Sequence, residues 1–501
     1  MFPSKRNSDA KFVLRKLPLQ ATLPPVNWEH LIALWGLLVF LLQVAGIYYA
    51  IQAIMTARTP QSAIGWSLAL IVLPIIAIPL FWIFGESKFA GYSHAGSGQN
   101  NALDAALLKC QEAIQPFDSS MSHKYSDSEA ITRGLRHLGA TEGNTVKLLI
   151  DGAATFESIF EEIDRAKELV VVQFYIIHDD GLGRALKERL LAAARRGVRC
   201  FVLYDSVGSK GITPEWIGGL RSAGVSVESF ITNRQRGRRF QINFRNHRKL
   251  VIVDGKVAFI GGLNAGDEYL GKGPLGAWRD THMRIEGPAV ATLQVPFLED
   301  WNYTTHTVPE LEFRPEASGN AKVLTFPSSP AQMWTVASAV YLEIIHDVRE
   351  RLWIASPYFV TDPATRTAIA HAALRGVDVR ILLPANADHL LPWLSSFTYY
   401  PQMQSAGVRI WRYGPGFMHQ KVLLADKDLS IVGSINLDFR SFMLNFELAA
   451  AVEDRDFATV VEEMFLQDFA RAKEENLSSF SDGGLLFRFK CRLASLMSPE
   501  Q

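Results

Sequence analysis

The feature that most constrains this chain is a polar motif that occurs twice with the same spacing. The first copy contains, in order, His247, Lys249, Asp254, Gly262 and Asn264. The second copy contains, in the same order, His419, Lys421, Asp426, Ser434 and Asn436. Every residue of the second copy lies 172 positions after its counterpart, and such a recurrence indicates that one structural unit is duplicated.

The segments around the two motifs predict an α/β fold. In both halves, segments of helical spacing alternate with apolar runs typical of strands, at residues 146–150, 169–177, 198–204, 352–356 and 377–383. This alternation is typical of a parallel or mixed sheet with helices on both faces. We therefore expect two αβα sandwich repeats, at residues 146–315 and 316–480.

Two apolar runs near the N-terminus indicate a membrane anchor. Residues 31–54 and 63–84 carry no charged side chain, and each run is long enough to cross about 30 Å of hydrocarbon as a helix. We expect a hairpin of two transmembrane helices within residues 30–85, although two buried helices of a soluble protein would show similar runs. Because the tail of residues 1–29 is basic, the positive-inside rule places it in the cytoplasm, and two crossings return the rest of the chain there.

Two further segments complete the expected organisation. Residues 86–145 are polar overall and predict a linker with a helix or two before the α/β body. Residues 481–501 place leucine and phenylalanine on one helical face with arginine beside it, which indicates an amphipathic tail. Such a helix either lies in the membrane interface or docks on the protein.

The composition limits the partners and cofactors. Lysine plus arginine and aspartate plus glutamate both number 51, so the basic excess typical of a nucleic-acid enzyme is absent and we expect no nucleic-acid partner. The three cysteines, Cys110, Cys200 and Cys491, are too far apart in the sequence to predict a disulfide framework or a metal site. The sequence contains no phosphate-binding glycine loop, and we expect no cofactor.

The residue types of the motif fit phosphodiester chemistry. A histidine and a lysine two positions apart on a strand point to the same face, so both can reach one anionic phosphate. If the two halves pack face to face, one imidazole can attack phosphorus while the other protonates the leaving alkoxide. The lysines, with Asn264, Asn436 and Ser434, would bind the phosphate or orient these groups without a metal.

Asp254 and Asp426 belong to the same motif and are candidate catalytic residues. Each of them follows four apolar residues that predict a buried strand. Their place at the end of that strand favours a structural role, in which the carboxylate holds a turn or a neighbouring donor.

The duplicated pattern H-x-K-x4-D-x6-G-[GS]-x-N resembles the signature of the phospholipase D superfamily. Residues 261–271, 278–282 and 436–447 resemble, more narrowly, its bacterial cardiolipin synthases. The resemblance implies two phospholipase D-like domains with the active site between them, in a multi-pass protein of the bacterial cytoplasmic membrane. It also implies a reaction in which two phosphatidylglycerol molecules give cardiolipin and glycerol.

The resemblance further assigns roles to individual residues. His247 would be the nucleophile that forms a covalent phosphohistidine, and His419 would be the general acid. Glu447 matches the acidic residue that holds an imidazole through its other nitrogen, and Asp280 is the weaker candidate for the same role. Asp280 could instead form a surface ion pair with Arg279.

The sequence leaves several functional alternatives open. A hydrolytic phospholipase D would use the same residues with water as the acceptor, and phosphatidylethanolamine could replace one phosphatidylglycerol. The zero net charge and the membrane hairpin disfavour a nuclease. Two intact motif copies disfavour a non-catalytic membrane scaffold. The sequence does not define the oligomeric state.

Overall fold

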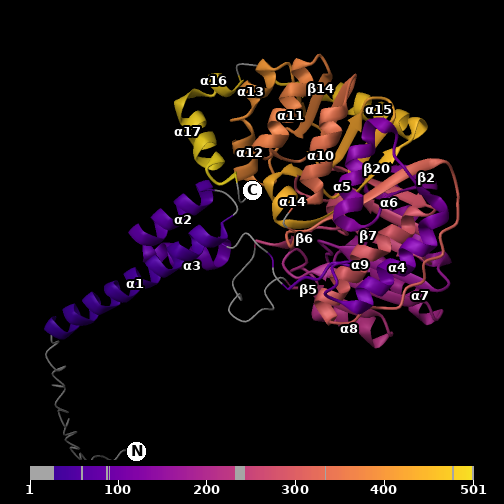
Figure 1. Cartoon of the computed structure of the whole chain (residues 1–501), viewed down its shortest axis with the longest axis horizontal. Coiled ribbons are helices and arrows are strands. Elements are labelled where there is room, and N and C mark those ends of the chain that lie inside the picture. Colours follow the sequence, from indigo (N-terminus) through magenta and orange to yellow (C-terminus); the bar gives the residue numbers. More distant parts are fainter. Residues whose placement is uncertain are drawn as a thin grey trace, which may run out of the picture.

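The chain forms a body of two similar halves from which a helical arm extends (Figure 1). The computed structural model describes residues 28–57, 60–85, 89, 91–231, 243–332, 334–476 and 479–498. Residues 1–27, which make up nearly all of the predicted cytoplasmic tail, lie outside the described residues.

Each half of the body contains a mixed sheet with the same strand order. In the first half the order is β5 (Ser226–Phe230), β4 (Arg199–Asp205), β3 (Leu169–Phe174), β7 (Leu250–Val253), β8 (Val257–Gly261), β10 (Thr281–Glu286) and β2 (Ala140–Ile150). In the second half it is β15 (Arg409–Tyr413), β14 (Asp378–Pro384), β12 (Arg351–Ala355), β17 (Val422–Ala425), β18 (Leu429–Gly433), β20 (Asn445–Glu453) and β11 (Ala321–Ser328). The first three strands of each series are parallel and the later neighbours are antiparallel, so the predicted duplication of an α/β unit is confirmed.

The two sheets are continuous through β2. This strand pairs antiparallel with β10 over residues 145–150, and its earlier part pairs antiparallel with β11 at Asn144 and Thr141. Short strand β21 (Ala472–Glu474) extends the far edge of the second sheet by pairing with β15. One strand of the first half therefore fixes the position of the second half.

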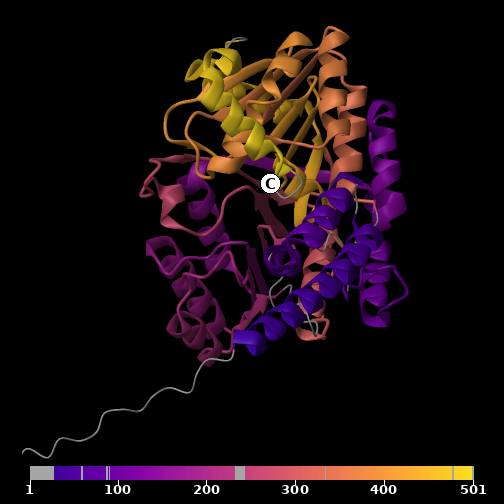
Figure 2. The same cartoon turned by 90° about the vertical axis from the view of Figure 1, so that its left-hand side faces the viewer.

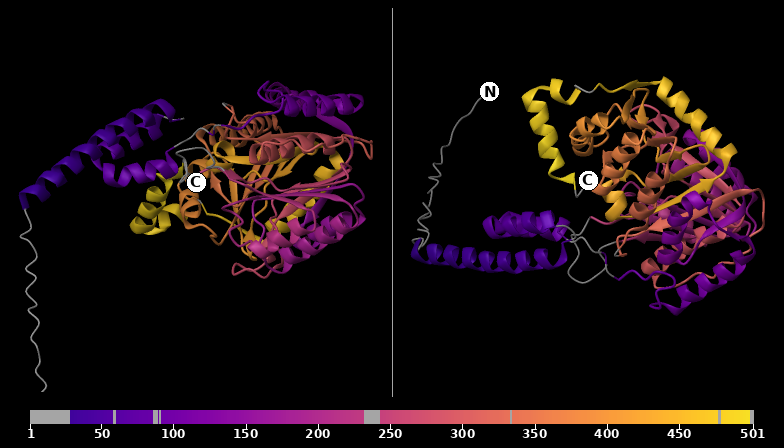
Figure 3. Two further views of the ribbon diagram at one scale, coloured as in Figure 1. Left: turned by 90° about the horizontal axis from the view of Figure 1, so that it is seen from below. Right: turned by 45° about the horizontal axis from the view of Figure 1, so that its top comes forward.

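Helices cover the outer faces of both sheets and also fill the space between them (Figure 3). The outer helices are α6 (Asp151–Arg165), α7 (Gly181–Arg195) and α8 (Pro214–Ser222) in the first half, and α10 (Val336–Asp347), α11 (Pro363–Leu374), α12 (Leu390–Ser396) and α13 (Tyr400–Ser405) in the second. The inner helices are α9 (Ala289–Thr305) and α15 (Arg455–Ala470).

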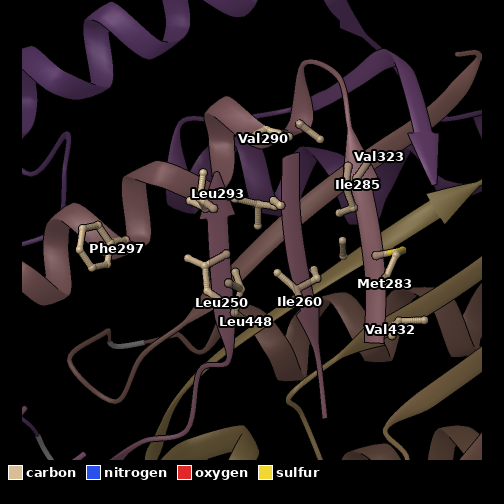
Figure 4. Packing of buried hydrophobic residues seen from close by; sticks show 14 of the residues in the cluster. Leu250, Ile260, Met283, Ile285, Val290, Leu293, Phe297, Val323, Val432 and Leu448 are labelled. Atoms are coloured by element: carbon tan, nitrogen blue, oxygen red, sulfur yellow. The ribbon is translucent and has the colours of Figure 1, made fainter. Parts of the chain in front are cut away.

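One hydrophobic cluster joins the inner faces of the two sheets. Figure 4 shows Leu250 and Ile260 of the first sheet beside Leu293 of α9, with Val432 and Leu448 of the second sheet close by. Burial of each such side chain contributes about 1.5–3 kcal/mol. The two halves therefore form one packed body, in which the relative position of the two motifs is fixed.

The arm consists of α1 (Trp28–Thr56), α2 (Pro60–Val72) and α3 (Pro74–Phe84). Helix α1 has 29 residues with a mean hydropathy of 2.2 in its most apolar window, and it is the one helix among the described residues with the length and composition to cross a membrane. Its apolar side chains are mostly exposed.

The second apolar run differs from the prediction, because it is not one spanning helix. It breaks before Pro74, whose ring removes a backbone donor and starts a new helix. Helix α2 lies antiparallel to the last half of α1, where Gln43 Nε2 donates to the Ile71 carbonyl over 2.8 Å. A side chain at Gly46 would overlap the Leu70 carbonyl, so these helices approach closely.

Helix α3 then turns back toward the body. The ring of Phe81 near its end lies 5.9 Å from Tyr49 of α1 and 5.3 Å from Trp66 of α2. At about 1.5 Å per residue, α2 and α3 are roughly 20 and 17 Å long, and neither spans about 30 Å of hydrocarbon alone. The described arm thus has one full-length helix and a shorter pair folded beside it.

The segment between the arm and the first sheet packs on the body. It contains α4 (Asn101–Ile114), which lies against α9, and α5 (Ser126–Arg136), which lies against α10. Arg136 at the end of α5 forms a buried ion pair of 2.6 Å with Glu299 of α9. Asn243 Nδ2 donates to the carbonyl of Phe84 at the end of α3 over 2.8 Å, so the arm is joined to the chain four residues before His247.

Candidate active site

The two H-x-K triplets meet where the two halves of the body face each other. His247–Lys249 connects β6 (Arg245–Asn246) to β7, and 419–421 connects β16 (Phe417–Met418) to β17. The prediction that each triplet lies within a strand is therefore wrong, but the four apolar residues after each lysine form a fully buried strand as expected. The middle residue of the first triplet, Arg248, points the other way and forms a buried ion pair of 2.9 Å with Asp300.

The backbone around each histidine is paired with the opposite half. Strand β6 pairs in parallel with the start of β20, and His247 N donates to the Phe446 carbonyl over 2.9 Å. Strand β16 pairs in parallel with β9 (Trp278–Arg279), and His419 N donates to the Arg279 carbonyl over 2.8 Å. Each histidine is thus positioned by a segment that belongs to the other repeat.

Each histidine also contacts a carboxylate of the other repeat. Glu447 of β20 lies 3.0 Å from His247 Nδ1, and Asp280, directly before β10, lies 2.7 Å from His419 Nδ1. His282 pairs with the motif glycine Gly261, and Ala449 pairs with Gly433. Each carboxylate lies two residues before the paired residue of its own strand. Asp280 and Glu447 are therefore equivalent residues that each contact the histidine of the partner repeat.

Asp280 is fully buried, so the alternative of a surface ion pair with Arg279 is wrong. Arg279 instead contacts Asp468 over 2.9 Å and Asp151 over 3.0 Å. A side chain at Gly262 would overlap Asp280 Oδ1, which explains why the first motif has glycine where the second has Ser434. The asymmetry of the two motifs thus follows from the room that each carboxylate needs.

Glu447 is held by a set of neutral donors in addition to His247. The hydroxyls of Ser434 and Ser441 donate to it over 2.5 and 2.7 Å, and Asn445 Nδ2 donates over 3.2 Å. Such a set stabilises an ionised carboxylate and fixes its direction. Ser434 therefore orients Glu447 in this structure.

The two motif lysines are buried beside the histidines. Lys249 Nζ donates to the His247 carbonyl over 2.7 Å, and Lys421 Nζ donates to the His419 carbonyl. Lys421 also lies 3.9 Å from Asp280. Burial lowers the pKa of both lysines, that of Lys421 to about 8. Two cations held close together out of water favour an anion between them.

Burial also determines the protonation of the histidines. It lowers the pKa of His247 to about 4, although the charge of Glu447 acts in the opposite direction. It lowers the pKa of His419 as well, and the charge of Lys421 lowers it further. It raises the pKa of Asp280 to about 6. Near neutral pH both imidazoles are therefore uncharged, with Nδ1 directed at a carboxylate and Nε2 able to act as a nucleophile or base.

The chain was compared with known proteins. The family model described as cardiolipin synthase, PLD-like domain, matches residues 159–301 and 341–469. Cardiolipin synthase A of Pseudomonas putida (strain GB-1) is 43% identical over 472 residues, which cover 93% of this chain and 98% of that protein. The chain belongs to the cardiolipin synthase family. Cardiolipin synthase A of Pseudomonas syringae pv. syringae is also 43% identical, over 474 residues that cover the same shares of both chains.

A solved structure shows the same fold as this cardiolipin synthase family member. Phosphatidylserine synthase of Haemophilus influenzae Rd KW20 superposes with a TM-score of 0.58 at 15% identity, covering 80% of this chain and 100% of that chain. Together with the two segments that the family model matches, this fold confirms the predicted architecture of two phospholipase D-like repeats.

The predicted asparagines line the site but are engaged by protein groups. Asn264 Nδ2 donates to the Tyr269 hydroxyl over 3.1 Å, and Asn436 Nδ2 donates to Asp438 over 3.1 Å. The Tyr269 hydroxyl also lies 3.2 Å from His419 Nδ1. Among the described residues, no group of three His, Cys, Asp or Glu side chains is arranged to hold a metal ion.

Two aromatic rings beside the histidines were not among the predicted site residues. The ring centroid of Tyr175 lies 5.0 Å from that of His247, and Trp278 lies at the same distance from His419. Trp278 directly precedes the Arg279-Asp280 pair, so its proximity to the site could have been inferred from the segment that resembles the family. Nothing in the sequence around Tyr175 indicates its position.

The structure places Asp254 and Asp426 away from the histidines, where they hold backbone donors as the structural reading of the motif expects. They lie at the far ends of β7 and β17, roughly 17 Å along the chain from the lysines. Asp254 accepts from the backbone N–H groups of Lys167, Glu168 and Leu169 over 2.8–2.9 Å. Asp426 accepts in the same way from residues 349–351 and pairs with Lys124.

We expect the Asp254→Ala variant to lose stability and keep its chemistry. The change leaves three backbone donors without an acceptor, which costs about 1–3 kcal/mol in the free energy of unfolding. The melting temperature should fall while kcat per folded molecule stays unchanged. The melting temperature of the Asp254→Asn variant should fall less, because asparagine tolerates the backbone φ of 52° and keeps one acceptor oxygen. A large loss of kcat at an unchanged melting temperature would contradict the structural role.

Proposed function

We propose that this protein is a phosphatidyltransferase that makes cardiolipin and glycerol from two phosphatidylglycerol molecules. The observation that carries the proposal is the pair of buried histidines, each held through Nδ1 by a carboxylate of the other repeat. Membership of the cardiolipin synthase family and the name of the relatives support the lipid substrate. The exposed apolar surface of α1 supports a membrane location.

In the first step His247 is the nucleophile. Its Nδ1–H donates to Glu447, which directs the Nε2 lone pair toward the phosphorus of the donor lipid. A P–N bond forms as the P–O bond to glycerol breaks, and His419 gives a proton to the leaving alkoxide. The products of this step are glycerol and a phosphatidyl-His247 intermediate.

In the second step the roles reverse. The glycerol hydroxyl of the second phosphatidylglycerol gives its proton to His419 and attacks the same phosphorus, and the P–N bond breaks to release His247. One phosphodiester bond replaces another, so the exchange needs no nucleotide. Water as the acceptor would give phosphatidic acid instead, which is the reaction of a hydrolytic phospholipase D.

Lys249 and Lys421 stabilise the negative charge on the phosphate oxygens in both steps. A pentacoordinate transition state concentrates negative charge on the equatorial oxygens, and a preformed cation in a water-poor site stabilises it strongly. The position of both lysines beside the two histidines supports this role, and a bound phosphate anion favours their charged form. In the empty site burial lowers the pKa of His419 and favours its uncharged form. The negative charge of a bound phosphate favours its protonated form.

Purified enzyme incubated with phosphatidylglycerol in detergent, without nucleotide, tests the proposed reaction. We expect cardiolipin and glycerol in equal amounts. Phosphatidic acid without cardiolipin would replace the proposal by a hydrolase, and a requirement for CDP-diacylglycerol would contradict the covalent mechanism. If phosphatidylglycerol alone gives no product but a mixture with phosphatidylethanolamine does, phosphatidylethanolamine would replace phosphatidylglycerol as the proposed donor.

For the side of the membrane, we propose that the catalytic body lies in the cytoplasm, as the basic N-terminal tail indicates. This placement requires α2 and α3 to cross the bilayer end to end, whereas here they fold back along one half of α1. Apolar proline-broken helices are tolerated in membranes, and the pair has 24 helical residues between them.

Cysteine labelling distinguishes the two arrangements. A cysteine at Ala57, between α1 and α2, and one at Val460 on the exposed face of α15 are each treated with a membrane-impermeant maleimide in intact spheroplasts. The native cysteines are buried and should not react. We expect Ala57→Cys to react and Val460→Cys to react only after lysis. Equal reaction of both positions would place the loop and the body on one side, and the α2–α3 pair would then be re-entrant.

A further inference from the structure

The C-terminal helix α17 (Gly484–Ser495) has one face fixed to the body. Cys491 and Ala494 are buried on this face. The ring of Phe487 lies 5.2 Å from Phe397, which follows α12, and the two helices pack along each other. The hydroxyls of Tyr399 and Ser498 are 2.9 Å apart at the end of the helix. Docking of α17 on the protein therefore uses only part of its apolar surface.

The opposite face of α17 is apolar and exposed. Leu486, Phe489, Leu493 and Leu496 follow one another at helical spacing, and each is more than half exposed. Leu390 and Leu391 at the start of neighbouring α12 are exposed as well, by 63% and 49%. Isolated exposed leucines are ordinary, but a continuous row of large apolar side chains marks an interaction surface.

The position of this surface in the molecule indicates what it binds. Figure 1 shows α17 on the side of the body from which α1, α2 and α3 extend. In Figure 2 this side faces the viewer, and α17 and the arm both lie on the near face. A bilayer that receives the exposed apolar residues of α1 is therefore next to α17. Arg488 and Arg492 flank the exposed row, which suits anionic headgroups.

The surface also borders the candidate active site. Asp388 and His389 directly precede Leu390, and Asp388 accepts a hydrogen bond of 2.5 Å from the Tyr358 hydroxyl. Asp388 is also close enough to His419 and Lys421 to act on them electrostatically. The loop that leads into α12 therefore joins the apolar surface to the catalytic groups.

We propose that the exposed face of α17, with Leu390 and Leu391 of α12, inserts into the headgroup region of an anionic bilayer and forms a second membrane contact beside the arm. This contact holds the second repeat against the lipid surface, so that headgroups reach His247 and His419 without leaving the membrane interface. The use of the contact rests on the proposed function. Its test measures contact with lipid and not catalysis, so that either proposal can fail alone.

The test places an environment-sensitive fluorophore on the full chain. Phe489→Cys carries an NBD group in the exposed row, and Val460→Cys, which is 45% exposed on α15, a helix on the side of the body away from the arm, is the matched control. The unsubstituted chain measures labelling of its buried cysteines. Each protein is reconstituted into vesicles of phosphatidylcholine with or without phosphatidylglycerol, and the lipids carry a doxyl quencher on the acyl chain.

We expect a blue-shifted emission that the doxyl lipids quench at position 489 and not at position 460, and stronger quenching in vesicles that contain phosphatidylglycerol. Emission at 489 that equals that at 460 in anionic vesicles would overturn the proposal. A blue shift of the emission at position 489 in lipid-free detergent that increases with protein concentration would also overturn the proposal, since a second copy of the chain would then cover the surface.

A variant extends the test to substrate use. The combined changes Leu486→Gln, Phe489→Gln and Leu493→Gln remove exposed side chains and leave the buried face intact, so the melting temperature should not change. We expect KM for phosphatidylglycerol in vesicles to rise about tenfold, with kcat for a short-chain, monomeric phosphatidylglycerol unchanged. An unchanged KM in vesicles would contradict the proposed contact. The variant with Leu466→Gln, an exposed leucine on α15, is the control.

Discussion

The His247→Asn variant should form no cardiolipin above background, with a loss of at least about 10⁴-fold in kcat. Asparagine keeps a polar group of similar size but has no lone pair on nitrogen that can attack phosphorus. The remaining groups, His419 and the two lysines, can bind and polarise the phosphodiester but cannot form the covalent intermediate. Lipid mass spectrometry of cardiolipin and an enzymatic assay of glycerol measure both products.

The intermediate itself provides the positive evidence. Wild-type enzyme denatured during turnover should carry one phosphatidyl group on the peptide that contains His247, and the adduct should be labile to acid. His346→Asn, an exposed histidine on α10, controls for the loss of a histidine elsewhere. If His247→Asn retains more than a few per cent of wild-type kcat, His247 is not the nucleophile. An adduct on His419 would exchange the roles assigned to the two histidines.

Loss of either buried carboxylate should reduce kcat by about 10²–10⁴-fold, as seen when an acid that holds a catalytic histidine is replaced by its amide. In Glu447→Gln the amide can donate to Nδ1 of His247, which then holds its own proton on Nε2 and loses its nucleophilic lone pair. In Asp280→Asn the amide holds the proton of His419 on Nε2 in the same way, so this imidazole can no longer accept the proton of the incoming hydroxyl in the second step. Melting temperatures should change little because the amides keep the volume of the acids.

The exchange between repeats makes the two variants distinguishable. Glu447 belongs to the second repeat, yet Glu447→Gln should slow the single-turnover formation of phosphatidyl-His247 in the first. Since the negative charge of Glu447 raises the pKa of His247 above the level set by burial, its removal should move the acid limb of that rate to lower pH. A purely structural carboxylate would leave the limb in place. Glu463→Gln on the surface of α15 is the control.

The duplicated fold and the core of the site could be predicted from the sequence because both leave a repeated trace. His247, Lys249, His419 and Lys421 recur at one offset, and the buried strands after them are four consecutive apolar residues. Alternation of strand-like and helix-like segments gave the α/β class for the same reason. Patterns that depend on neighbouring residues are visible in the chain itself.

The pairing of the carboxylates could not be predicted in the same way. Asp280 lies 16 positions after Asn264, whereas Glu447 lies only 11 positions after Asn436. The loop of the first repeat, which includes the short helical turn η3 (Asp267–Leu270), is five residues longer, and this difference hides the equivalence of the two acids. Their exchange between halves depends on the pairing of β6 with β20 and of β9 with β16, which join residues 200 and 139 positions apart in the sequence.

The arm shows a second limit of inference from the sequence. Residues 63–84 satisfy the composition of a spanning helix throughout, and the break at Pro74 is one that membranes often tolerate. The direction that α3 takes after the break depends on the packing of Tyr49, Trp66 and Phe81. Hydropathy counts apolar residues and does not report such contacts.

The crossed contacts of His247 and His419 have a consequence for the origin of the molecule. A chain with only one repeat would hold a histidine and a carboxylate that do not reach each other, and it could build this site only in a symmetric homodimer, where each copy completes the other. Fusion of two such copies removes the need for assembly and frees each half to diverge. The difference between Gly262 and Ser434 and the different lengths of the loops before Asp280 and Glu447 are features that identical subunits could not have.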